Sequence, residues 1–168
     1  MAKHEKKSKI KISKTKSEWV WDIFGYGVYL GSIIFLIYNW NSLPNQVPAH
    51  FNAAGEVDRW GSKYELLTLP IIGAFIAVLM QFVEKYPETH NYPKRLNEKN
   101  AKEFYLISRK TSNSIKNISL IVFAFIVFES ISIAMKWGDP SGKWFIPLIV
   151  ISVTIPIVIG FVRQRKIR

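Results

Sequence analysis

Five polar residues have side chains that could bind a ligand or carry a proton: His50, Asn52, Asp58, Lys63 and Glu129. The first four lie close together between two apolar stretches. Glu129 lies inside an apolar stretch, where an ionisable group is costly and indicates a function by default. We treat all five as candidate ligand-binding residues, and no residue has the setting of a catalytic group.

A structural role is the alternative for the loop residues. Asn52 and Asp58 could bond turn amides and His50 a carbonyl, because buried backbone groups must be paired. A metal site is not expected, since one histidine with one or two carboxylates is a poor zinc ligand set. The other histidines, His4 and His90, are predicted to lie across the membrane. No cofactor is expected either.

Glu129 has its own alternatives. It could be a protonatable group facing a polar cavity, as in a small transporter or a lipid-processing membrane subunit. It could equally be structural, either paired with Lys136 or protonated and bonded to Ser130 or Ser132.

These residues must be positioned by membrane-spanning helices. A helix needs about 20 apolar residues to cross a hydrocarbon core of about 30 Å. Four segments qualify: about Trp19–Trp40, Leu66–Val83, Ile118–Met135 and Trp144–Val162. The predicted fold is therefore an all-α, four-helix transmembrane bundle with a small extracytoplasmic loop or hairpin between the first two helices.

The charged residues lie mainly outside these apolar segments. The chain is 49% hydrophobic yet carries a net charge of +11. Because the basic residues flank apolar runs, the expected partner is a bilayer with anionic headgroups and not a nucleic acid. The lysine-rich tail, Lys3–Lys16, is expected to be disordered in water and to serve as a topology signal.

The distribution of Lys and Arg predicts the orientation. Residues 1–18, 84–116 and 163–168 hold 19 of these residues, whereas 41–65 and 136–143 hold 4. Both termini are therefore predicted to be cytoplasmic, in a multi-pass protein of the cell membrane.

The spans divide the chain into four parts. These are a basic tail (1–18), two helices with the outer loop 41–65 (19–84), a cytoplasmic loop with a helical stalk (85–117), and two further helices with a basic tail (118–168). The stalk is expected to start near Asn97, to run unbroken into the third span, and to hold its charges in solvent. Docking of a soluble partner is the alternative for those charges.

The outer loop is predicted to be a compact lid. Ala49–Asn52 and Val57–Trp60 can pair as a hairpin about a turn at Gly55. Ser62, followed three residues later by Glu65, forms a capping box for the second helix.

The same loop carries a family resemblance. It reads Leu43-Pro44-x-x-Val47-Pro48-x-His50-Phe51-Asn52-x-x-Gly55-x-x-Asp58-x-x-Gly61-Ser62-Lys63. This pattern, after an apolar helix, resembles the bacterial membrane domain DUF1648, which forms the N-terminal part of Sdp-type toxin-immunity and signalling proteins. The resemblance covers about the first half of the chain. The Gly-Asn entry and the Gly-x-x-Thr-Pro-Trp stretch of the immunity proteins' second half are absent.

Hydrolase, kinase and redox motifs are also absent from the sequence. The function expected is therefore non-enzymatic: recognition of a ligand or peptide at the outer face, similar to immunity or signalling proteins. Candidate partners are a peptide or another membrane protein. A small transporter or lipid-processing subunit that uses Glu129 is the alternative.

Overall fold

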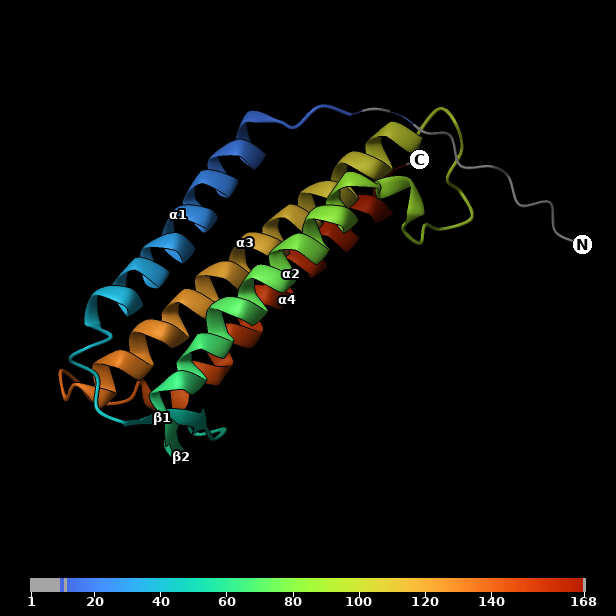
Figure 1. Ribbon diagram of the computed structural model, residues 1–168. Helices are drawn as coiled ribbons and strands as arrows, with labels where there is room; N and C mark the ends of the chain where they lie inside the picture. The colour runs from blue at the N-terminus through green and yellow to red at the C-terminus, as the bar shows by residue number, and fades with distance from the viewer. Residues whose placement is uncertain (1–9, 11, 168) are drawn as a thin grey trace, which may run out of the picture.

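The computed structural model describes residue 10 and residues 12–167. Four long helices form the molecule (Figure 1): α1 (Lys16–Asn39), α2 (Thr68–Lys85), α3 (Ala101–Ala134) and α4 (Phe145–Arg165). Two strands lie between α1 and α2, β1 (Gln46–Phe51) and β2 (Val57–Ser62). Short 3₁₀ turns are η1 (Lys63–Leu67), η2 (Pro87–Thr89) and η3 (Gly142–Trp144). The predicted all-α, four-helix transmembrane bundle with a small hairpin between the first two helices is confirmed.

Four helical segments are long and apolar enough to cross a membrane: Lys16–Asn39, Lys63–Lys85, Ala101–Ala134 and Gly142–Arg165. Large apolar side chains cover the outside of the bundle. Val20, Ile34 and Phe75, for example, are each about two-thirds exposed. A water-soluble protein rarely exposes so much contiguous apolar surface, so these faces suit lipid. The chain is a multi-pass membrane protein.

Helix α3 is the central helix of the bundle, because α1, α2 and α4 each pack against it. It runs unbroken over 34 residues, as expected for a span continued by a stalk. At 1.5 Å per residue it is about 50 Å long, well beyond a hydrocarbon core of about 30 Å.

The two ends of the bundle differ (Figure 1). Helix α1 begins and α4 ends at one end, which we call the tail end. The strands and the short connection between α3 and α4 lie at the opposite end, which we call the hairpin end.

Strands β1 and β2 form an antiparallel hairpin. Val47 pairs with Gly61 and Phe51 with Val57, and a bulge lies beside His50. The strands extend further than the sequence predicts, to Gln46 and to Ser62. Gly55 occupies the turn with φ +74°, a conformation that favours glycine.

An apolar cluster closes the bundle beneath the hairpin. Val47 and Leu43 from the loop are buried with residues from all three neighbouring helical segments: Leu36, Leu66, Val127 and Ile131. On the other side of the hairpin, a Cβ added to Gly55 would overlap the carbonyl of Gly142. The hairpin is therefore held on both sides by the bundle.

The predicted capping box is present. The Ser62 hydroxyl accepts a hydrogen bond from the Tyr64 amide, and the Glu65 carboxylate accepts one from the Ser62 amide. It caps η1, the 3₁₀ turn that leads directly into α2.

Candidate functional site

The polar residues of the loop are engaged mainly within the hairpin. Asn52 organises the turn, since its Oδ1 accepts from the amides of Ala54 and Glu56 at 2.9 and 3.0 Å. Its Nδ2 donates to the Glu56 carboxylate. This Asx-type arrangement is the common use of asparagine in a tight turn.

His50 and Asp58 form an exposed pair across the hairpin, with Nδ1 and Oδ1 2.6 Å apart. Lys63 points elsewhere: its ammonium donates to the Trp40 carbonyl at 3.2 Å and lies 5.3 Å from the centre of the indole ring. The structure therefore brings His50 and Asp58 together but does not gather the loop candidates into one site.

Glu129 is buried at the hairpin end, with 7% of its surface exposed. Its carboxylate accepts hydrogen bonds from the backbone amide and the hydroxyl of Ser141, in the connection between α3 and α4. Its partner is thus Ser141, and not Lys136, Ser130 or Ser132 as the sequence suggested. The carboxylate ties this connection to α3.

Two substitutions of Glu129 should separate a structural role from a chemical one. Glu129→Gln keeps an acceptor for Ser141, so we expect nearly unchanged stability. Glu129→Leu leaves the Ser141 amide without its acceptor and should lower the free energy of unfolding by about 1–3 kcal/mol. Unfolding in detergent micelles measures both, and equal stability of the two variants would contradict this assignment.

A second polar cluster lies at the tail end, where the sequence predicted solvated charges. Arg109 and Lys116 of α3 are 5% and 0% exposed. The expectation of a solvent-exposed stalk is therefore wrong over this part of α3. Both side chains face the neighbouring helices, because each finds carboxylates there.

Six charged residues form this ion-pair network, which consists of a connected group of four (Lys14, Asp22, Glu84 and Lys116) and a neighbouring pair (Arg109 and Glu18). It holds three cations and three carboxylates, so its formal charges balance. The members come from the segment before α1 and from α1, α2 and α3, so the network joins all of these elements.

Lys116 is at the centre of the network. Its ammonium lies 2.7 Å from a Glu84 oxygen, 2.9 Å from an Asp22 oxygen and 3.1 Å from the Gln81 amide oxygen. Asn113 and Asn117 donate to the same Asp22 oxygen at 2.7 and 2.9 Å. These bonds satisfy charges that would be very costly if left unpaired away from water.

Arg109 connects the network to residues 12–15, which we call the strap. Its guanidinium forms a two-pronged ion pair with Glu18 at 2.8 and 3.0 Å. It also donates to the carbonyls of Ile12 and Ser13. The predicted disordered tail, Lys3–Lys16, is thus ordered over the strap, whereas its residues 3–9 and 11, with His4, lie outside the described residues.

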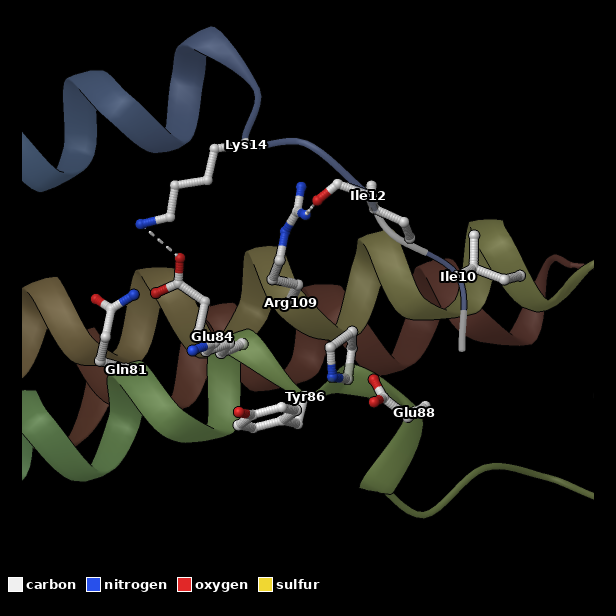
Figure 2. Close-up of a pocket in the computed structure, with 10 residues that line it drawn as sticks. Ile10, Ile12, Lys14, Gln81, Glu84, Tyr86, Glu88 and Arg109 are labelled. Atoms are coloured by element: carbon white, nitrogen blue, oxygen red, sulfur yellow. Dashed lines mark hydrogen bonds and ion pairs between the residues drawn. The ribbon is translucent and has the colours of Figure 1, made fainter. Parts of the chain in front are cut away.

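Lys14 extends from the strap to Asp22 at 2.5 Å. Its ammonium also lies 2.9 Å from Glu84, as Figure 2 shows. Burial alone would lower the pKa of its ammonium, but the bonds to these two carboxylates raise the pKa above the ordinary lysine value. Lys14 is therefore charged throughout the neutral range, and its ammonium would lose its proton only in strongly alkaline solution.

A cavity of about 420 Å³ opens beside the strap. Figure 2 shows Ile10, Ile12 and Lys14 on one side of it, and Glu84, Tyr86 and Glu88 on the other. Its lining mixes both signs of charge with apolar side chains, and it is bounded by the strap, the end of α2 and Arg109 of α3.

With this geometry established, comparison with known proteins places the loop. Residues 27–74 match a family described as "Domain of unknown function (DUF1648)". This is the family that the loop signature resembles. The match runs from the middle of α1 through the hairpin into α2.

An "Uncharacterized protein" of Archaeoglobus fulgidus is 35% identical over 66 residues. The match covers 38% of this chain and 36% of that protein, so the chain matches about a third of this curated relative's length. Because this relative is archaeal, similarity to this chain is not confined to bacteria. No solved structure matches the chain.

The DUF1648 match covers the hairpin but none of the six charged residues of the ion-pair network. All six lie outside residues 27–74: Lys14, Glu18, Asp22, Glu84, Arg109 and Lys116. The network therefore joins elements on both sides of the DUF1648 segment at the tail end, whereas the DUF1648 hairpin lies at the other end (Figure 1).

Two sequence signals could have revealed the network. The first signal is Asp22, a charged residue that lies inside the predicted first span, although the apolar residues around it make it easy to overlook. On α3, Arg109, Asn113, Lys116 and Asn117 recur at helical spacing and share one face. A polar stripe on a membrane-inserted helix predicts burial against other helices, since lipid does not solvate it.

Proposed function

We propose that this protein is a non-enzymatic membrane receptor for a peptide, which it binds through the DUF1648 hairpin at the outer face. Immunity to a toxic peptide or signalling would be the outcome. The observation that carries the proposal is that β2 is an accessible edge strand on a hairpin fixed firmly to the bundle.

Fixation of the hairpin supports a preformed binding surface. Val47 is completely buried in the apolar cluster, and Gly55 lies directly against Gly142. A ligand that binds a fixed surface does not have to order it first, which favours affinity.

Strand β2 supplies the edge. Strand β1 lies between β2 and α3, and β2 contains no buried residue. Within the described residues the sheet has only these two strands. An accessible edge binds extended peptides by adding a strand, with side chains around it setting specificity.

Exposed side chains flank this edge and could provide that specificity. Trp60 is 49% exposed and Tyr64 66% exposed. The pairs His50–Asp58 and Arg59–Glu65 lie beside them, both open to solvent. Aromatic residues on an exposed surface are the usual anchors of protein recognition. In this proposal the binding surface is shaped by the loop candidates His50, Asp58, Asn52 and Lys63.

The alternative function, a transporter or lipid-processing subunit with Glu129 as its proton carrier, has less support. The Glu129 carboxylate is engaged by Ser141, and the space beneath the hairpin is filled by apolar side chains. Both features support a structural role for Glu129.

We further propose that the protein lies in the cell membrane with its tail end in the cytoplasm. The bias of Lys and Arg toward the tail end supports this orientation. Because the chain lacks cysteine, single cysteines can report it. In whole cells an impermeant thiol reagent should label Asn52→Cys and spare Asn97→Cys, and the reverse pattern would overturn the orientation.

The receptor proposal predicts a specific loss on truncating Trp60. The peptide fraction secreted by the source organism of this protein is applied to a strain that is sensitive to it. The strain should survive when it produces the full chain. Trp60→Ala should lower the highest peptide concentration that this strain survives at least tenfold, as loss of a central aromatic anchor typically does.

The matched control is Trp144→Ala, which removes another exposed tryptophan of the hairpin end that is not on the hairpin. It should protect as well as the unmodified chain. Absence of protection by the unmodified chain, or equal loss in both variants at equal membrane levels, would contradict the receptor proposal.

A further inference from the structure

A second cavity lies on the membrane-facing side of the bundle, in a groove between α1, α3 and α4. Its volume is about 450 Å³, within the range of small-molecule sites. The lining residues are Trp21 of α1; Ile107, Lys110, Thr111, Ser114 and Ile118 of α3; and Ser152, Ile155, Pro156, Ile159, Gly160 and Arg163 of α4.

Polarity changes along the length of this groove. Lys110 and Arg163 lie toward its tail-end side together with Ile107, whereas Ile118, Ile155 and Ile159 lie deeper. At 1.5 Å per residue Ile118 is about 12 Å further along α3 than Lys110, and Ile155 about 12 Å further along α4 than Arg163. Lys110 lies about 36 Å along α3 from Ala134, which places it at headgroup level beyond a core of about 30 Å.

The two cations of the groove differ from the neighbouring cations in their partners. Arg109 and Lys116 are paired with carboxylates. Among the residues that the structure describes, no carboxylate lies within ion-pair distance of Lys110 or Arg163. Two cations without counter-ions at one end of an apolar groove complement a negatively charged headgroup.

The groove is shaped by small residues and one proline. A Cβ on Gly160 would overlap Thr111 Oγ1, so α3 and α4 lie very near each other there. Away from this contact, Ser114 and Ser152 leave space between the helices. The hydroxyls of Thr111 and Ser152 bond carbonyls of their own helices. The lining therefore presents mostly satisfied or apolar groups toward an acyl chain.

From these observations we propose that the groove holds one anionic phospholipid. Its phosphate lies between Lys110 and Arg163, and one acyl chain follows Ile118, Ile155 and Ile159 into the membrane. Trp21 covers the entrance from α1. The site is separate from the peptide surface proposed above, since that surface lies at the hairpin end of the bundle.

Trp21 offers a direct measurement. The full-length chain in detergent micelles is titrated with phosphatidylglycerol or phosphatidylcholine whose acyl chains are brominated to quench nearby tryptophan. The Trp21 signal is the difference between the unmodified chain and Trp21→Phe. We expect phosphatidylglycerol to quench it at about tenfold lower concentration than phosphatidylcholine, because two basic residues face the headgroup.

The test variant is Lys110→Gln with Arg163→Gln. It should lose the preference for phosphatidylglycerol, whereas Lys94→Gln with Lys102→Gln, which removes two exposed tail-end charges outside the groove, should keep it. Equal unfolding midpoints of the two double variants confirm that both are folded.

Four results would overturn the proposal. Three of them are an unchanged preference in the groove variant, an equal loss in the control variant, and displacement of phosphatidylglycerol by millimolar inorganic phosphate. The last would assign the basic pair to a soluble anion. A Trp21 signal that neither lipid quenches would likewise remove the lipid from the groove.

Discussion

Replacing Lys116 with methionine is expected to lower the free energy of unfolding by about 3–5 kcal/mol, the usual cost of breaking a buried ion pair. The ammonium is completely buried and bonds Glu84, Asp22 and Gln81. Without it, two carboxylates share the single remaining cation of Lys14. Reversible unfolding of the full chain in detergent micelles measures the loss.

The control and a rescue variant sharpen this prediction. Lys102→Met removes an exposed lysine from the same helix and should change stability by no more than about 0.5 kcal/mol. Lys116→Met with Glu84→Met should recover much of the loss, because Lys14 and Asp22 remain paired. If Lys116→Met were as stable as Lys102→Met, the network would not hold the tail end together.

The bundle and hairpin could be predicted because their signals are local. Span length follows from an unbroken apolar run, and the turn at Gly55 and the cap at Ser62 follow from neighbouring residues. The strand ends were less predictable. Strand β1 begins at Gln46 and includes the buried Pro48, whereas the sequence predicted a start at Ala49.

The ion-pair network could not be assembled from the sequence in the same way. Glu18 and Arg109 are far apart in the chain, and only the packing of α1 on α3 brings them together. Lys14 was assigned to a solvated tail because a lysine-rich segment is ordinarily exposed. Its partly buried position depends on the carboxylates of Asp22 in α1 and Glu84 in α2.

The hairpin candidates illustrate the opposite case. His50, Asn52 and Asp58 have the types of ligand-binding residues, and their grouping in the sequence suggested one site. The structure uses Asn52 within the turn and pairs His50 with Asp58 on the surface. Proximity in a loop did not bring them together with Glu129, because Glu129 lies in α3 and bonds Ser141.

Placing a carboxylate at Val47 is expected to detach the hairpin from the bundle. Val47 is completely buried among Leu36, Leu66 and Ile131, with no cation to pair with an acid in that cluster. Val47→Asp should therefore lower the free energy of unfolding by about 3 kcal/mol or more, as an uncompensated buried charge does. Detergent unfolding measures the loss.

Trypsin cleavage after Arg59 provides a local measure of the same event, since Arg59 lies in β2 and its side chain is exposed. A detached hairpin loses strand structure and should be cleaved there faster in Val47→Asp than in the unmodified chain, while the helices remain protected by micelles. Gln46→Asp adds the same charge one residue earlier, at an exposed position, and should be cleaved at the unmodified rate.

Under the receptor proposal, Val47→Asp should also abolish protection against the secreted peptide, because the edge of β2 would no longer be preformed. Equal cleavage of the two aspartate variants would show that the apolar cluster does not hold the hairpin, and the preformed edge would lose its physical basis.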